Sequence, residues 1–165
     1  KNLLLAYQKL PLEMSLRFPL VISGYQGWES EELHRLFDIG SQRGWIKYLG
    51  YTDQQSLSVL FSACRAFLFP SRYEGFGFPV LEAMAAGTPV ITSNVSSLPE
   101  VAGDAGLMVD PDDVDQLTHY ISDIILNDSL CAELIKRGFL QNAKFSWANC
   151  AGETIKAYKL VNLQE

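Results

Sequence analysis

Strand-like and helix-like segments alternate along this chain, and the alternation limits the folds that it can adopt. Short runs rich in Val, Ile, Leu and Phe are separated by longer stretches in which apolar residues have helical spacing. Parallel strands need a crossover between them, usually a helix, so this pattern predicts an α/β fold: a Rossmann-like, doubly wound parallel sheet with helices on both faces. The expected strands are 18–23, 45–49, 66–69, 90–92 and 107–109, and the expected helices are 2–10, 29–42, 52–65, 78–86, 112–126, 129–143 and 146–160, with a short helix after residue 97.

Several of these helices are expected to begin at residues that cap helix N-termini. Thr52 and Asp53 precede one helix, and Ser97 and Glu100 have the spacing of a capping box. In a capping box each of the two side chains accepts a hydrogen bond from a backbone amide at the helix start. Asp110, followed by a proline, is expected to cap the helix after the fifth strand.

The 165 residues suffice for a single domain, residues 1–165, with a core of its own. There are 13 Lys and Arg against 19 Asp and Glu, a net charge of −6. This balance argues against nucleic acid as a partner, because phosphate backbones are bound by basic surfaces. Three cysteines and two histidines show no metal-ligand spacing, so we expect no metal site and a reducing, cytoplasmic environment. The apolar runs are too short to span a bilayer.

The most distinctive segment runs from Pro70 to Met84, directly after a predicted strand. Ligands of parallel α/β sheets gather at the carboxyl ends of the strands. Gly75 and Gly77 would let the backbone approach a ligand closely, and the helix that follows has a proline in its first turn. The free amides and the positive dipole end of this helix start, at residues 78–81, predict an anion site.

Two glutamates, Glu74 and Glu82, flank the expected anion site, one in the loop and one about a turn inside the helix. Carboxylates do not bind phosphate, but they accept hydrogen bonds from sugar hydroxyls. The arrangement therefore suggests a phosphorylated sugar, with its phosphate on the helix start and its hydroxyls on the carboxylates. The alternative is a solvated loop glutamate beside a glutamate on a helix surface, since the spacing of two glutamates is not specific by itself.

A longer pattern surrounds these residues. It comprises Pro70-Ser71, Glu74-Gly75-Phe76-Gly77-Phe78-Pro79, Glu82-Ala83-Met84-Ala85-Ala86-Gly87-Thr88-Pro89-Val90, Ser93-Asn94, Leu98-Pro99-Glu100-Val101-Ala102-Gly103, Asp110-Pro111 and Phe145-Ser146-Trp147, where Ser146 is expected to cap the last helix. This pattern resembles the donor-binding signature, with its glutamate-x7-glutamate motif, of retaining glycosyltransferases of the GT-B fold, family 4 or group 1. Lys1-Asn2 is similar to the end of the family's Arg-Lys-Asn segment, so the resemblance covers almost the whole chain.

The resemblance implies a role for each matching residue. Glu74 would be catalytic and hold hydroxyls of the donor sugar beside its anomeric carbon, and Glu82 would accept hydrogen bonds from the ribose. Lys1 would neutralise the departing diphosphate, whose distal phosphate would lie on the amides of the helix start. The donor-binding residues implied by the family are Lys1, Gly24 near the diphosphate, Gly50 and Tyr51 near the base, and Gly75, Phe76, Gly77, Phe78, Pro79, Val80, Leu81 and Glu82. No metal and no cofactor would be needed.

The resemblance further implies transfer of a sugar from a nucleotide-diphosphate sugar to an acceptor glycan or lipid-linked saccharide in polysaccharide biosynthesis. Configuration would be retained and nucleoside diphosphate released. Residues 93–101 are most similar to mannosyltransferases, so GDP-mannose is the expected donor. The full-length protein is expected in the cytoplasm, with peripheral association at the inner face of the membrane.

The chain departs from the family pattern because it supplies only the second of two Rossmann-like domains. In family members the arginine that partners Lys1, the strand before the first helix and the acceptor-binding domain all lie upstream. We therefore expect the isolated chain to be inactive. A missing strand would leave unpaired backbone inside the sheet. We therefore expect another segment or another chain to fill its place, with self-association as one route, or the protein to be longer than these 165 residues.

Two other functions stay open at this point. A nucleotide-sugar 2-epimerase of similar fold would bind the same donor, and a non-catalytic α/β nucleotide-binding module would keep the fold without the chemistry. Arg72 is either a phosphate ligand or a solvated loop residue. The aspartates at 110–115 mimic a metal-binding motif, but their place before a helix favours capping. Trp28, Trp45 and Trp147 are expected to be packing residues.

Overall fold

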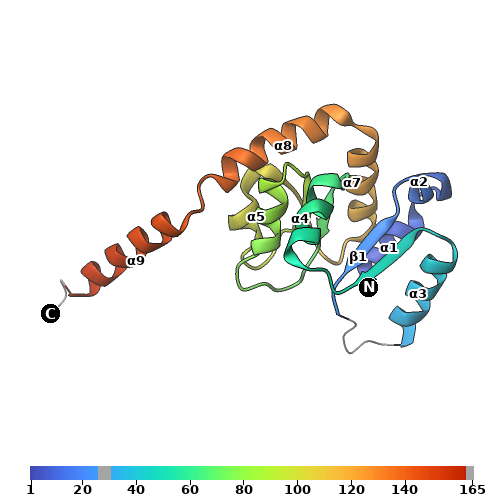
Figure 1. The fold of residues 1–165 in the computed structure, drawn as a ribbon, viewed down its shortest axis with the longest axis horizontal. Coiled ribbons are helices and arrows are strands. Elements are labelled where there is room, and N and C mark those ends of the chain that lie inside the picture. Colours follow the sequence, from blue (N-terminus) through green and yellow to red (C-terminus); the bar gives the residue numbers. More distant parts are fainter. Residues whose placement is uncertain (26–30, 163–165) are drawn as a thin grey trace.

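The chain forms an α/β domain in which helices and parallel strands follow one another as the sequence predicts (Figure 1). The computed structural model describes residues 1–25 and 31–162, so the predictions for Trp28 and Glu29 lie outside the described residues. All five expected strands form, each within two residues of its predicted bounds. The elements are α1 (Asn2–Lys9), α2 (Leu12–Arg17), β1 (Leu20–Ser23), α3 (Glu31–Gln42), β2 (Ile46–Gly50), α4 (Gln54–Ala63), β3 (Phe67–Phe69), α5 (Phe78–Ala85), β4 (Val90–Ser93), α6 (Leu98–Ala102), a 3₁₀ turn (Gly103–Ala105), β5 (Gly106–Val109), α7 (Val114–Leu126), α8 (Asp128–Asn142) and α9 (Trp147–Asn162).

The sequence analysis missed α2, which begins directly after Pro11. Glu13 in its first turn and Arg17 in its last turn complement the helix dipole. The short segment after α2 is tied back to α1, because the hydroxyl of Tyr7 donates to the carbonyl of Phe18 at 2.8 Å. Burial raises the pKa of Tyr7 to about 12, so this phenol stays a hydrogen-bond donor at neutral pH.

The helix caps are confirmed in part. Asp53 caps α4 by accepting a hydrogen bond from the amide of Ser56 at 2.9 Å, and this bond lowers the pKa of the aspartate. Ser146 likewise accepts from the amide three residues later, at the start of α9. The prediction for Asp110 was wrong: Asp113 caps α7, whereas Asp110 closes a tight turn by accepting from the amide two residues later.

The two faces of the sheet that contains β3 and β4 are covered by different helices, as predicted. Phe67, Phe69 and Val90 pack into a core with α5 and α6, whereas the intervening Leu68 and Ile91 pack into a second core with α1 and α7. This alternation follows from the period of two in a β-strand. Trp45, expected to be a packing residue, is buried in the second core.

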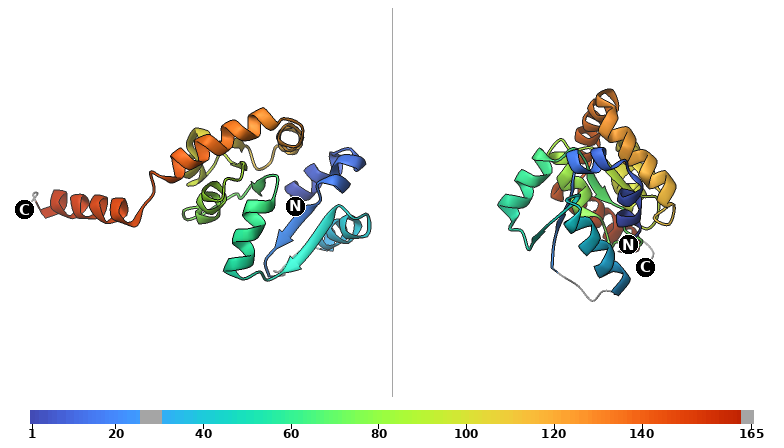
Figure 2. Two further views of the ribbon diagram at one scale, coloured as in Figure 1. Left: turned by 45° about the horizontal axis from the view of Figure 1, so that its top comes forward. Right: turned by 90° about the vertical axis from the view of Figure 1, so that its right-hand side faces the viewer.

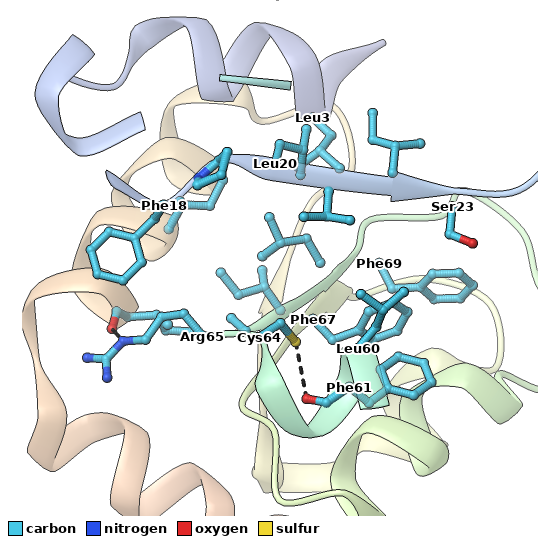
Figure 3. Close-up of a pocket in the computed structure, with 18 of the residues that line it drawn as sticks. Leu3, Phe18, Leu20, Ser23, Leu60, Phe61, Cys64, Arg65, Phe67 and Phe69 are labelled. Carbon is cyan, nitrogen blue, oxygen red and sulfur yellow. Dashed lines mark hydrogen bonds between the residues drawn. The ribbon is translucent and has the colours of Figure 1, made fainter. Parts of the chain in front are cut away.

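The parallel strands form two separate sheets. β1 pairs with β2, while β4 lies between β3 and β5. β1 and β3 both line a cavity of about 660 Å³ whose walls are mainly apolar (Figure 3). The cavity occupies the gap between the two sheets, at the place where the family pattern predicts a further strand.

Backbone hydrogen bonds show which groups face this gap. The amide of Leu20 donates to the carbonyl of Trp45, just before β2, and the amide of Phe67 donates to the carbonyl of Pro89, just before β4, both at 2.8 Å. Backbone groups of successive residues in a strand point in opposite directions. The amides of Val21 and Leu68 therefore point into the gap.

Helix α9 extends away from the rest of the domain, as Figures 1 and 2 show in red. Several of its apolar side chains are exposed, among them Ile155, Tyr158 and Val161. The prediction that Trp147, at the start of α9, is a packing residue was wrong, because this side chain is 80% exposed; its ring centroid lies 6.4 Å from that of Phe78 on α5. Within the described residues, none of the helices is long and apolar enough to cross a membrane.

Helix α5 begins after Gly77, which has a left-handed backbone with φ of 113°. A Cβ atom at this position would lie 2.9 Å from Cδ2 of Leu98, a fully buried side chain of α6. Only glycine satisfies both constraints, so the turn that sets the direction of α5 depends on it.

We expect Gly77→Ala to destabilise the domain by about 1–3 kcal/mol, because it adds backbone strain and a clash with Leu98. Chemical denaturation of the purified chain measures the change. Gly75→Ala is the matched control, since a Cβ atom there meets no atom within 4 Å. Equal stability of the two variants would contradict this account of the turn.

We also expect amide hydrogen exchange to alternate beside the gap. Leu20 and Phe67 should exchange about tenfold or more slowly than Val21 and Leu68, because only the first pair donates to a neighbouring strand. NMR detection of exchange resolves single amides, and Ile91 of the central strand β4 serves as a protected reference. Similar protection of all four amides would mean that another segment pairs with these edges.

Candidate functional site

The loop between β3 and α5, residues 70–77, is held against the loop that follows β4. The hydroxyls of Ser93, Ser96 and Ser97 donate to carbonyls of this loop, and the Ser96 hydroxyl also accepts from the amide of Glu74 at 3.2 Å. Both loops leave the carboxyl ends of adjacent parallel strands. The candidate site therefore lies at the sheet edge where ligands of α/β folds bind.

The prediction of a capping box at Ser97 and Glu100 was wrong. Ser97 makes no side-chain cap on α6. Its hydroxyl instead donates to the carbonyl of Glu74 at 3.0 Å and to that of Phe76 at 2.8 Å. The local sequence pattern favours capping, but the hydroxyl oxygen of Ser97 instead takes part in a tertiary contact with the loop of residues 70–77.

The start of α5 presents a small set of backbone amides. The amide of Val80 donates to the carbonyl of Gly77 at 3.0 Å, and Pro79 has no N–H. Among the described residues, no hydrogen bond is found for the amides of Gly77 and Phe78, which precede the first hydrogen bond of the helix, so these two remain for a ligand. They lie at the positive end of the helix dipole, which favours an anion.

Glu82 and Glu74 occupy different parts of the site. Glu82 is half-buried on α5 and lines the cavity together with Pro79, Phe69 and Ser23, the last two of which are labelled in Figure 3. Glu74 is half-buried in the loop, where its Oε1 accepts from the hydroxyl of Ser71 at 2.8 Å. Within the described part of the chain neither carboxylate forms an ion pair, so both keep oxygen lone pairs for hydroxyl donors.

The ends of β1 and β2 form a second wall at the same edge. The amide of Gly24 donates to the carbonyl of Gly50 at 2.9 Å, and the hydroxyl of Ser23 lies 2.6 Å from that of Thr52. Gly24 and Gly50 both have positive φ. These contacts bring the predicted residues Gly24, Gly50 and Tyr51 into one place.

Sequence reasoning missed Tyr25, whose ring stacks on that of Tyr51 at a centroid distance of 5.1 Å. Both rings are mostly exposed, at 80% and 66%. The only signal in the sequence was that each tyrosine follows a glycine at the end of a predicted strand. Ser71 and Ser96 were also missed as partners of Glu74: Ser71 lies in the family pattern but was given no role there, and Ser96 lies outside that pattern.

Two cations near the site have acidic partners. Nζ of Lys1 lies 2.7 Å from Glu32 in the first turn of α3, and both side chains are exposed. Arg72 pairs with Asp112 in the loop after β5, and its side chain is 70% exposed. Residues 1–25 and 31–162 contain no group of three or more His, Cys, Asp or Glu side chains that could hold a metal ion.

Comparison with known proteins finds relatives among the glycosyltransferases. The model of the family "Glycosyl transferases group 1" matches residues 1–141. The chain is 51% identical to O-antigen chain mannosyltransferase B of Escherichia coli, over 98% of this chain and 42% of that protein. It is 36% identical to the serotype-specific mannosyltransferase WbdA of Escherichia coli, over 93% of this chain and 19% of that protein. The chain thus spans less than half the length of these relatives.

Solved structures share the fold at lower identity. Anabaena Alr3699/HepE, in complex with UDP and glucose, superposes with a TM-score of 0.78 at 19% identity, over 96% of this chain and 44% of that one. WaaG, a glycosyltransferase involved in lipopolysaccharide biosynthesis, superposes with a TM-score of 0.74 at 20% identity, over 88% of this chain and 39% of that one. The predicted fold class, that of a GT-B glycosyltransferase, is confirmed.

The family expected from the residues around Glu74 and Glu82 is therefore found by comparisons that extend over most of the sequence. The chain belongs to the group 1 glycosyltransferases.

Proposed function

We propose that this chain is the donor-binding domain of a retaining, metal-independent glycosyltransferase whose donor is a nucleotide-diphosphate sugar. The observation that carries the proposal is the meeting of three features at one sheet edge: the amides at the start of α5, Glu82 at the cavity and Glu74 in the adjoining loop. An anion on the amides leaves a carboxylate on either side for sugar hydroxyls. A nucleotide-diphosphate sugar has the matching order of groups: a diphosphate for the amides, with ribose hydroxyls on one side and sugar hydroxyls on the other for the carboxylates.

In this proposal the phosphates are held by backbone N–H dipoles, and Lys1 supplies one positive charge. The free backbone amides at the start of α5 face the distal phosphate. Lys1 adds its charge by exchanging Glu32 for the diphosphate, which is feasible because an exposed ion pair is worth only about 0–1 kcal/mol. Fixed donors then stabilise the charge that develops on the leaving group, so the chemistry requires no metal.

The names of the relatives support a mannosyl donor. O-antigen chain mannosyltransferase B and WbdA are both described as mannosyltransferases, and GDP-mannose is therefore the proposed donor. The acceptor is a glycan or lipid-linked saccharide held largely outside these 165 residues, which makes the isolated chain inactive in transfer. The proposed location is cytoplasmic, at the inner face of the membrane.

We expect the purified chain to bind GDP weakly, with a dissociation constant in the range of about 10⁻⁴ to 10⁻³ M, and EDTA to leave the affinity unchanged. Glu82→Ala should weaken binding about 5- to 30-fold, since it removes a charged acceptor of ribose hydroxyls. Titration calorimetry with GDP, UDP and ADP measures both effects.

Glu13→Ala is the matched control, because Glu13 is an exposed glutamate of α2, at the amino end of β1. Unchanged affinity in Glu82→Ala would show that the ribose lies elsewhere. Binding that requires a divalent ion would contradict the metal-independent mechanism.

Glu74 should act on the sugar rather than on the nucleotide. In the full-length enzyme, Glu74→Gln keeps the size of the side chain but removes the charge that favours a developing positive charge at the anomeric carbon. We expect kcat to fall about 10²- to 10³-fold, with little change in the inhibition constant of nucleoside diphosphate.

Glu100→Gln, which changes an exposed glutamate of α6, should keep its kcat. A normal kcat in Glu74→Gln would assign Glu74 to a solvated loop. Poor nucleotide binding with a normal kcat would mean that the roles of the two glutamates are exchanged.

A further inference from the structure

Glu74 is held at both its carboxylate and its backbone by hydroxyl groups. Ser71 donates to Oε1 of Glu74 at 2.8 Å, which fixes one carboxylate oxygen. Ser96 donates to the carbonyl of Glu74 at 2.8 Å and accepts from its amide at 3.2 Å, so one hydroxyl satisfies both backbone groups of this residue. The rotation of the carboxylate and the orientation of its backbone are thus set by two separate side chains.

The backbone of Ser96 is itself unusual. Its φ of 60° is the one positive value for a non-glycine residue in the described part of the chain. A left-handed conformation at such a residue costs free energy and persists only where the surroundings determine it. Here the surroundings are the two hydrogen bonds to Glu74, which require the hydroxyl to project back across the loop.

Neighbouring hydroxyls extend the same contact along the loop. Ser97 donates to the carbonyls of Glu74 and Phe76, and Ser93 donates to the carbonyl of Ser71. Ser97 thereby leaves α6 without a side-chain cap, a loss that typically costs about 1 kcal/mol. The segment after β4 thus holds the loop of residues 70–77 that carries Glu74 (the Glu74 loop). In return, helix α6 lacks the stabilisation that a side-chain cap would give.

We propose that Ser71 and Ser96 are positioning residues that fix the Glu74 carboxylate before the donor sugar arrives. The inference rests on the proposed role of Glu74 at the sugar. A carboxylate that is already oriented needs no rearrangement when charge develops at the anomeric carbon, and small misplacements of such a group are costly in rate. The nucleotide, which is held at α5, does not depend on these hydroxyls.

The test compares variants in the full-length enzyme. Ser96→Gly removes the strain of a left-handed backbone, so the melting temperature should stay the same or rise. The same change removes the hydroxyl, so kcat should fall about 10- to 100-fold. Ser71→Ala should lower kcat over the same range, and Ser71→Thr, which keeps a hydroxyl, should recover most of it. The inhibition constant of nucleoside diphosphate should stay unchanged in all three variants.

Ser122→Ala is the control, because the Ser122 hydroxyl donates only to a carbonyl within α7, at 3.0 Å. Normal kcat in Ser96→Gly and Ser71→Ala, with Glu74→Gln impaired, would overturn the positioning role alone. A fall in kcat matched by a fall in melting temperature, without recovery in Ser71→Thr, would also overturn it. Normal kcat in Glu74→Gln would instead refute the proposed function, and the positioning role with it.

Discussion

The parallel pairing of β3, β4 and β5 determines where the rest of the site lies. Phe67 is opposite Val90, and Val90 is opposite Gly106, so the three strands start in register and end at the same edge. The loops that follow them therefore emerge side by side. The contacts that join the loop of residues 70–77 to the loops after β4 and β5 depend on this register, since they connect residues that are 21 to 40 positions apart in sequence.

Features with a local cause could be predicted from the sequence. Asp53 and Ser146 cap the helices that they precede, and Gly77 with Pro79 sets the start of α5, because each of these effects acts within one turn of the chain. The sequence pattern also predicted Glu74 and Glu82 as site residues, and the structure places one in the loop after β3 and the other on α5. It did not reveal how Glu74 is held, since Ser71 and Ser96 act through the geometry of two loops.

Predictions from the sequence were wrong where a local contact and a tertiary contact compete for the same side chain. Ser97 has the sequence context of a cap, yet its hydroxyl is used by the Glu74 loop. Asp110 precedes a helix, but the chain turns first and Asp113 becomes the cap. The stacking of Tyr25 on Tyr51 likewise depends on two strand ends meeting, which no spacing along the chain reports.

The gap between β1 and β3 also bears on how the domain holds together. No backbone ladder joins the two sheets in the described residues, and the connection is made by side chains of the core that α1 shares with α7, including Leu4, Tyr7, Ile91 and Ile121. Apolar packing is non-directional, whereas a ladder of hydrogen bonds fixes register. We therefore expect the half that contains β1, α3 and β2 to be able to unfold as one unit while the β3–β5 half stays folded. The cooperativity of unfolding then depends on the side chains that pack across the gap.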